Sequence, residues 1–296
     1  MINGLSSLRE RGESRVVSRQ VMVIEEVFKT VDNNFNLSPK IKTEIKELLI
    51  IYVSKNPRVD LGTINTNLTN LKFTECNKYF IKDPLKYVNF DKTIYINTSE
   101  SNKDYDYKYL LMRELMLMQT YKNDISKMRQ MHLNSIYEGY ASISANNYIG
   151  NNGNYNPYED EIIIVNLLGK IVGFESIEEL FNNNNQELLM DNLAKMGNSI
   201  DDVKSITNLM NYNSNIKENP RGKSMLKEVQ LKLIKMFVKK GELTNDDIDK
   251  FRSLLFGNEV VFEQEVDKYK DINQVYKFFD EIVSNFELKE TVVKGR

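Results

Sequence analysis

The sequence predicts a mostly helical α+β protein with one small β-sheet. Three observations support this fold class. Apolar residues recur at helical spacing through most of the 296-residue chain. The one convincing β segment lies within residues 58–100, where β-branched and aromatic runs are bounded by Pro84, Asn89 and Asp91. Capping residues, prolines and glycines divide the rest into segments of helical length. A chain of this size can bury the core of one large domain or of two ordinary ones.

Two helices are expected before the sheet. The first covers about residues 17–31, where valine and isoleucine form an apolar stripe. The second begins after Ser38, an N-cap residue, with Pro39 at the first helical position. It should run to about Ser54, because Pro57 cannot continue a helix.

The sheet is expected from two runs of residues that favour strands. These are Asn-Lys-Tyr-Phe-Ile at residues 77–81 and Lys-Thr-Ile-Tyr-Ile-Asn at residues 92–97. Pro84 and Asn89 lie between the runs and interrupt them. The composition therefore predicts a sheet of two to four strands.

Every later segment has the pattern of a helix. A Gly/Asn-rich loop at residues 149–156 precedes a helix that Pro157 opens and Gly173 ends. Ser176 and Glu179 have the spacing of a capping box for the helix that follows. Other helices are expected over about residues 109–121, 133–148, 186–196, 200–211, 222–240, 245–256 and 262–286.

The predicted organisation has three parts. Residues 1–16 form a flexible tail, which contains arginines but no apolar stretch of the kind that a secretory signal needs. Residues 17–211 form the main domain, and residues 212–296 form a C-terminal helical subdomain. The break falls at the polar, proline-containing stretch at residues 211–220.

Composition excludes several classes of protein. The net charge of −2 and the pI of about 5.8 exclude a basic field over the whole protein of the kind that binds nucleic acid. No apolar run approaches the ~20 residues that span a bilayer. The single cysteine, Cys76, cannot form an internal disulfide, which is typical of a reducing compartment. We therefore expect a cytoplasmic protein, or one delivered by a route that needs no secretory signal.

One helical segment contains an incomplete metal-binding motif. A helix with H-E-x-x-H, followed by a second helix with a ligand glutamate, forms the zinc site of many metallopeptidases. Here residues 113–117 read Arg-Glu-Leu-Met-Leu, and Glu138 follows on the next predicted helix. Both glutamates are present, whereas Arg113 and Leu117 stand at the two histidine positions.

Further pieces in the same order extend this similarity. They are the strand at residues 93–97, Glu138-Gly139-Tyr140, residues 158–161, residues 167–173 and Leu180-Phe181. On these residues, the region from about 92 to 196 resembles bacterial zinc metallopeptidase-like proteins of the gluzincin type. The resemblance implies a zincin-like pair of motif helices beside the sheet. It also implies that Glu114 stands at the general-base position and Glu138 at the third-ligand position.

Arg113 and Leu117 replace two of the metal ligands of the motif. Leu117 has no donor atom, and the guanidinium of Arg113 stays protonated and repels a cation. No metal or other cofactor is therefore expected. Because a carboxylate buried without a counter-charge is costly, we expect Arg113 to replace zinc as the counter-charge, bonding Glu138 and also Glu114.

The leading functional hypothesis is a pseudoenzyme, a non-catalytic binding or structural protein on a degenerate peptidase scaffold. Its partner would be another protein or a larger assembly. One alternative is an active peptidase whose zinc is held by Glu138 with other carboxylates or with His132, the only histidine. Another is a helical regulator that binds nucleic acid through the lysines of residues 217–240, although an apolar stripe there indicates an ordinary solvated helix face.

The sequence contains two further patterns. Gly222-Lys223-Ser224 is not a P-loop, because the first glycine of that motif and the preceding strand are missing. Tyrosines surround the motif helices. They fill a former substrate cleft, offer a binding surface for a peptide, or pack as ordinary core and surface residues. They are Tyr105, Tyr107, Tyr109, Tyr121, Tyr137 and Tyr140.

Overall fold

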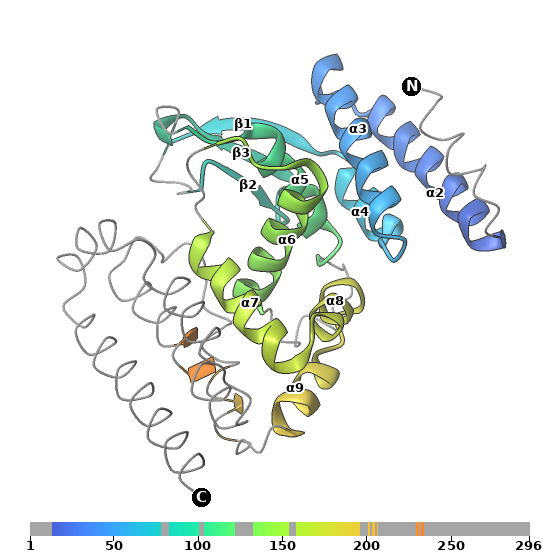
Figure 1. Ribbon diagram of the computed structural model, residues 1–296. Helices are drawn as coiled ribbons and strands as arrows, with labels where there is room; N and C mark the ends of the chain where they lie inside the picture. Colours follow the sequence, from blue (N-terminus) through green and yellow to red (C-terminus); the bar gives the residue numbers. More distant parts are fainter. Residues whose placement is uncertain are drawn as a thin grey trace, which may run out of the picture. The chain divides into compact units, whose positions relative to one another are not determined.

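The computed structural model describes residues 14–77, 83–100, 104–121, 133–153 and 158–195, together with eight single residues between 201 and 233 (Figure 1). Within these ranges the protein is mostly helical with one three-stranded sheet, which confirms the α+β class. None of the described helices combines the length and the apolar character that crossing a membrane requires. The helices predicted at residues 245–256 and 262–286 lie outside the described residues.

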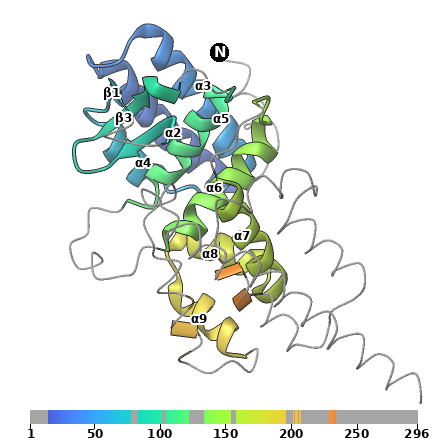
Figure 2. The ribbon, with the colours of Figure 1, turned by 90° about the vertical axis from the view of Figure 1, so that its left-hand side faces the viewer.

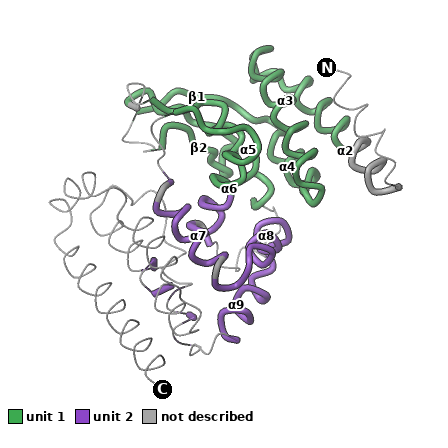
Figure 3. The backbone as a smooth tube through the Cα atoms, in the orientation of Figure 1, with its two compact units in different colours: residues 1–130, 141–157 green, residues 131–140, 158–296 purple. Residues whose placement is uncertain are grey.

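The chain divides into two compact units (Figure 3). Unit 1 contains Met1–Gln130 and Ala141–Pro157, and unit 2 contains Met131–Tyr140 and Tyr158–Arg296. The division falls inside one helix, α6 (Asn134–Ile149). The boundary predicted between residues 211 and 212 lies outside the described residues and stays a prediction.

The described part of unit 1 begins with three helices. Helix α2 (Ser14–Asn33) starts three residues before the predicted helix, so the end of the predicted flexible tail is helical. Helix α3 (Pro39–Lys55) begins as predicted, with Ser38 accepting a bond from the Ile41 N–H at 3.4 Å. Helix α2 packs against both α3 and α4, the third helix (Figures 1 and 2).

Helix α4 (Leu61–Leu68) was not predicted. The carboxylate of Asp60 caps it by accepting a bond from the Thr63 N–H at 3.0 Å. Leu61, Ile64 and Leu68 are all buried, at the spacing of one helix face. Packing of this face therefore decides the structure of a segment whose glycine, threonines and asparagines favour helix poorly.

The sheet of unit 1 has three strands in the order β1-β3-β2, within the predicted number. Strand β1 (Lys72–Cys76) is parallel to β3 (Thr93–Asn97), and β2 (Leu85–Val88) is antiparallel to it. A short 3₁₀ helix, Thr98–Glu100, follows β3. Only β3 was predicted. The strand expected at residues 77–81 lies almost entirely outside the described residues, and β1 ends before it.

Helix α5 (Tyr107–Met118) is the first motif helix, and it packs against α3, α4 and β2. Every residue from Tyr109 to Met118 is buried, as the apolar pattern predicts. The Asp106 carboxylate caps α5 by accepting a bond from the Tyr109 N–H at 3.1 Å. It also accepts bonds from the backbone and side-chain amides of Asn152, both at 3.1 Å, so the loop after α6 is attached to the start of α5.

Unit 2 contains the first half of α6, then α7 (Glu159–Val172), α8 (Phe174–Asn183) and α9 (Gln186–Lys195). Gly173, with φ of +84°, ends α7 as predicted. Pro157 lies outside the described residues, and α7 begins at Glu159 with Tyr158 as its N-cap residue.

The capping box predicted at Ser176 is wrong. The chain turns at Gly173 alone, so α8 begins directly at Phe174 and Ser176 lies inside its first turn. There the Ser176 hydroxyl donates to the Val172 carbonyl at 3.0 Å. Because glycine can adopt a positive φ, one residue is enough to connect α7 to α8. The capping box would have required a longer connection, with α8 starting after Ser176.

At Gly139, α6 comes close to α7 in unit 2. A Cβ placed on it would lie 2.2 Å from the Glu161 carbonyl oxygen and 2.7 Å from a Val165 methyl. Gly139→Ala is therefore expected to lower the free energy of unfolding by about 1–3 kcal/mol, because backbone rather than a mobile side chain has to move. Urea unfolding followed by circular dichroism measures it. Gly62→Ala is the matched control, since its Cβ would meet only Asp60, at 3.5 Å. Equal effects at the two glycines would contradict the close approach.

Candidate functional site

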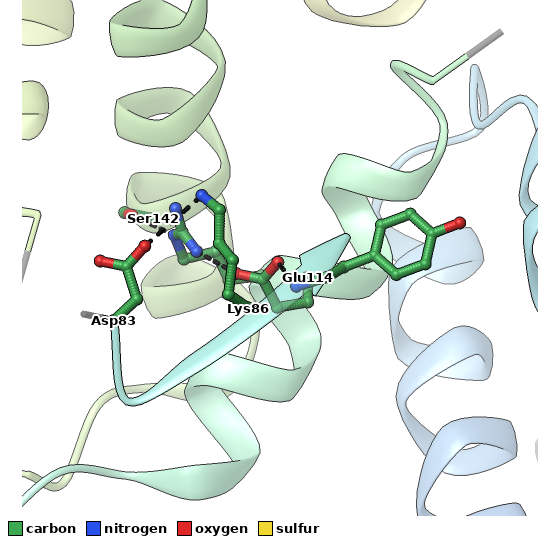
Figure 4. A network of polar contacts seen from close by, with 6 residues as sticks. Asp83, Lys86, Glu114 and Ser142 are labelled. Atoms are coloured by element: carbon green, nitrogen blue, oxygen red, sulfur yellow. Dashed lines mark hydrogen bonds and ion pairs between the residues drawn. The ribbon is translucent and has the colours of Figure 1, made fainter. Parts of the chain in front are cut away.

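The four positions of the degenerate motif are all buried. Arg113, Glu114 and Leu117 lie on α5 in unit 1, and the side chain of Arg113 has no exposed surface. Glu138 lies on the part of α6 that belongs to unit 2. The candidate site described below is the polar cluster around Arg113 and Glu114 in unit 1 (Figure 4).

Both carboxylate oxygens of Glu114 accept hydrogen bonds. Oε1 accepts one from Nη1 of Arg113, the preceding residue, in a buried ion pair. Oε2 accepts one from the backbone N–H of Tyr87 at 2.8 Å. Because Tyr87 lies in β2, Glu114 joins α5 to an edge strand of the sheet. The carboxylate is thus occupied by a cation on one side and by the strand backbone on the other.

Arg113 joins α5 to a second element. Its Nε donates to the hydroxyl oxygen of Ser142 at 3.0 Å, and Ser142 lies on the part of α6 that belongs to unit 1. The side chain therefore points into the protein, which the counter-charge hypothesis requires, and it bonds Glu114. The bond between Arg113 and Glu138 stays a prediction.

A second ion pair lies next to the first. Nζ of Lys86 is 3.6 Å from a carboxylate oxygen of Asp83, and both side chains are about nine-tenths buried. Lys86 precedes Tyr87 on β2, so the strand contributes both a cation and a backbone N–H to the surroundings of Glu114 (Figure 4). Two cations thus face two carboxylates, and the cluster is electrically balanced.

The environment of Glu114 acts on its protonation in two directions. Burial raises the pKa of Glu114 above its usual value, because the charged form loses its hydration. The charges of Arg113 and Lys86 and the Tyr87 N–H lower that pKa, and the Asp83 charge raises it. The net direction is upward, because the effect of burial outweighs that of the positive neighbours and the Tyr87 N–H.

The cluster has cations where a metal site would have neutral donors. Among the residues that the structure describes, no three His, Cys, Asp or Glu side chains are grouped so that they could hold a metal ion. Leu117 is buried and offers no donor atom. The arrangement can hold secondary-structure elements together through charge-assisted hydrogen bonds.

Other candidates from the sequence are only partly described. His132 and residues 222–224 lie outside the described residues. Within the lysine-rich segment, Val229 and Leu233 are fully buried, as its apolar stripe predicts, and Lys232 is partly exposed. Of the tyrosines around the motif helices, Tyr109 and Tyr137 are buried. Tyr137 and Tyr140 both pack against the ring of Phe181 within unit 2, with ring centroids 6.0 and 4.6 Å from it.

The bond from Arg113 to Ser142 and the bond from the Tyr87 N–H to Glu114 were not predicted. Ser142 lies four residues after Glu138, and this places both on one face of α6. That spacing in the sequence could have indicated that Ser142 lies on the same face of α6 as the motif residue Glu138. Leu85 and Tyr87 are buried and alternate with the less buried Lys86 and Val88, a period of two that indicates a strand. Four residues are too few to separate this pattern from chance.

No family model matches the chain, and neither a curated protein nor a solved structure matches it.

Proposed function

We propose that this chain is a non-catalytic binding or structural protein, built on a scaffold similar to that of the gluzincin-type zinc metallopeptidases. The observation that supports the proposal is that both carboxylate oxygens of Glu114 already accept hydrogen bonds from the protein. Its oxygens accept bonds from the Arg113 guanidinium and from the Tyr87 N–H. A general base in such a peptidase must instead take a proton from a zinc-bound water.

The charge at the first ligand position supports the same conclusion. A guanidinium does not lose its proton in proteins, so Arg113 cannot become a metal ligand at any physiological pH. A zinc ion in its place would meet Leu117 at the second ligand position, where no donor exists. Two of three protein ligands are therefore absent from a site that normally needs three.

The buried ion pair takes over the structural role that a metal would have. Arg113 attaches α5 to α6 through Ser142, and Glu114 attaches α5 to β2 through Tyr87. The chain thus keeps the connections between the motif helix and its neighbours without the reactive centre. We propose that such a scaffold offers a rigid surface to which another protein binds. Glu138 would then be a remnant of the third metal ligand.

Metal content tests the proposal directly. The full chain, incubated with one equivalent of zinc and dialysed, is expected to retain far less than one zinc per chain by elemental analysis. Stoichiometric zinc would instead support an active peptidase with an unorthodox site.

The double variant Arg113→His/Leu117→His tests the scaffold. It is expected to unfold at a lower temperature than the natural chain without metal, because Glu114 loses its counter-charge. It should bind zinc and regain melting temperature when zinc is added, since binding stabilises the folded state. Arg113→His alone is the matched control, with one histidine too few. Addition of Glu138→Gln to the double variant should weaken zinc binding; unchanged binding would contradict the assigned role of Glu138.

A further inference from the structure

The two edges of the sheet in unit 1 differ. Strands β1 and β2 lie on either side of β3, so each has one row of backbone groups that faces away from the sheet (Figure 1). At the β2 edge, the Tyr87 N–H donates to a carboxylate oxygen of Glu114 at 2.8 Å. The candidate site thus occupies one edge of the sheet, and β1 forms the opposite edge.

Phe73 and Glu75 direct their backbone groups outward from the β1 edge. Lys72 donates its N–H to the carbonyl of Lys92 at 2.9 Å, so the backbone groups of Lys72 face β3. Because this direction alternates along a strand, those of Phe73 and Glu75 face the other way. Within the described ranges, no residue bonds the outward N–H or C=O of either one.

The β1 edge is accessible to a further strand. Thr74 and Glu75 are exposed and Phe73 is half-buried, and β1 pairs with β3 without a bulge or a proline. Proteins commonly protect an edge strand with such interruptions, with a covering element or with charged side chains. Of these devices, β1 has charged side chains, those of Lys72 and Glu75. A partner strand with complementary charges would find them attractive instead.

An apolar row crosses the sheet and ends at this edge. Phe73 pairs with Ile94, and Ile94 pairs with Tyr87 on the far strand. Ile94 and Tyr87 are buried, whereas Phe73, at the open end of the row, is only half-buried. An apolar side chain opposite Phe73 would lengthen the row and cover its ring.

The two charges of β1 are available to a partner. Lys72 and Glu75 are the charged residues of the strand, both are exposed, and neither forms an ion pair with a described residue. Asp91 and Lys92, just before the adjoining strand β3, are already bonded within unit 1. A basic residue opposite Glu75 and an acidic residue opposite Lys72 would complement the edge.

We propose that a partner protein adds an extended segment to β1 as a fourth, antiparallel strand of the sheet. Phe73 and Glu75 would each exchange N–H···O bonds with the residue opposite, and antiparallel pairs are the more stable per residue. Read from its N-terminus, the segment has a basic residue, any residue, an apolar residue and an acidic residue, opposite Glu75, Thr74, Phe73 and Lys72. The proposal rests on the protein-binding role proposed above and names its surface and its kind of partner.

Fluorescence polarisation of a labelled peptide tests the proposal with the full chain. The probe Thr-Arg-Thr-Ile-Glu has arginine opposite Glu75 and isoleucine opposite Phe73, and it is expected to bind. N-methylation of its arginine or its isoleucine removes an N–H that faces β1 and should weaken binding about tenfold. N-methylation of the central threonine should leave binding nearly unchanged, because that N–H faces away. Equal losses at all three positions, or no binding by the unmethylated probe, would overturn the proposal.

A charge exchange tests the register. Glu75→Lys should bind the probe roughly two- to fivefold more weakly and should prefer Thr-Glu-Thr-Ile-Glu, in which glutamate replaces the arginine. Its melting temperature should stay unchanged, because Glu75 is exposed. Glu47→Lys, at an exposed position on α3, is the matched control and should bind both peptides like the natural chain. An unchanged preference in Glu75→Lys would contradict the proposed pairing.

Two further measurements separate this proposal from its alternatives. Light scattering detects a second copy as the occupant: a natural chain that dimerises and binds no probe, with Glu75→Lys monomeric, would overturn the proposal. Zinc content separates it from the function proposed above. A chain that retains no zinc and binds no probe overturns strand addition alone, whereas stoichiometric zinc in a chain that binds the probe overturns the non-catalytic role alone.

Discussion

Arg113→Met is expected to lower the free energy of unfolding by about 3–5 kcal/mol, the cost of breaking a buried ion pair on one side. The substitution removes the counter-charge of Glu114 and the donor to Ser142, while methionine fills much of the same volume. Urea unfolding of the natural chain and the variant gives the difference.

A double-mutant cycle shows whether the loss of stability comes from the interaction between Arg113 and Glu114. Glu114→Gln keeps an oxygen for the Tyr87 N–H but removes the charge. The double variant Arg113→Met/Glu114→Gln is expected to be more stable than the sum of the single effects predicts, because no buried charge is left unpaired. Lys40, whose side chain is 84% exposed and lies 3.9 Å from Glu44, provides the control. Lys40→Met should change stability by less than about 0.5 kcal/mol. An effect as small for Arg113→Met would contradict a structural role for the cluster.

The same variant should respond to pH. Burial already raises the pKa of Glu114, and Arg113 opposes that rise. Without Arg113 the pKa rises further above the value in the unfolded chain. A carboxyl group of this kind destabilises the fold when the pH is above its folded-state pKa, and the penalty disappears as the pH falls toward the unfolded-state pKa. The deficit of Arg113→Met relative to the natural chain should therefore be smaller at pH 5 than at pH 8. A deficit that grows on acidification would contradict this assignment.

The elements that sequence predicts correctly are those whose signals are local. Ser38 and Pro39 define the start of α3 within two adjacent residues. Helix α5 is predicted because ten consecutive buried positions contain mostly leucine and methionine, which favour helix regardless of their neighbours. Gly173 ends α7 through its own backbone freedom.

The elements that sequence misses are decided by distant contacts. Helix α4 and strands β1 and β2 are short, with four to eight residues each. Their local preferences are weak, so the packing of α2 on α4 and the pairing of both strands with β3 determine them. A four-residue strand has no period long enough to be distinguished from a turn.

The candidate site shows the same limit. The motif places Arg113 and Glu114 on a buried helix, and the charge argument predicts that they pair. Their other partners are 29 and 27 residues away along the chain, in Ser142 and in the backbone of Tyr87. A backbone N–H has no residue type, so the bond from Tyr87 to Glu114 leaves no mark in the sequence at all.

Asn67→Ala is expected to lower the free energy of unfolding by about 2–4 kcal/mol, because a fully buried amide satisfies three groups at once. Its nitrogen donates to the carbonyls of Met118 and Tyr121, at 2.8 and 3.2 Å, and its oxygen accepts a bond from Lys92. The first carbonyl belongs to the last residue of α5 and the second lies three residues further on. Carbonyls at a helix end have no donor within the helix. Loss of the amide removes a hydrogen bond from each of the two carbonyls and leaves a cavity in its place.

The arrangement at Asn67 repeats that at Asn34, whose amide donates to the last carbonyl of α4 and to the carbonyl three residues beyond it. Asn67→Asp distinguishes the loss of the amide donor from the loss of side-chain volume. It preserves the shape and an acceptor for Lys92, yet it puts a negative charge against two carbonyls at the negative end of α5. It should therefore destabilise at least as much as Asn67→Ala. Thr66→Ala removes an exposed hydroxyl from the same helix and should change stability by less than about 0.5 kcal/mol. If Asn67→Asp unfolds like the natural chain in urea, the amide nitrogen is not what closes the end of α5.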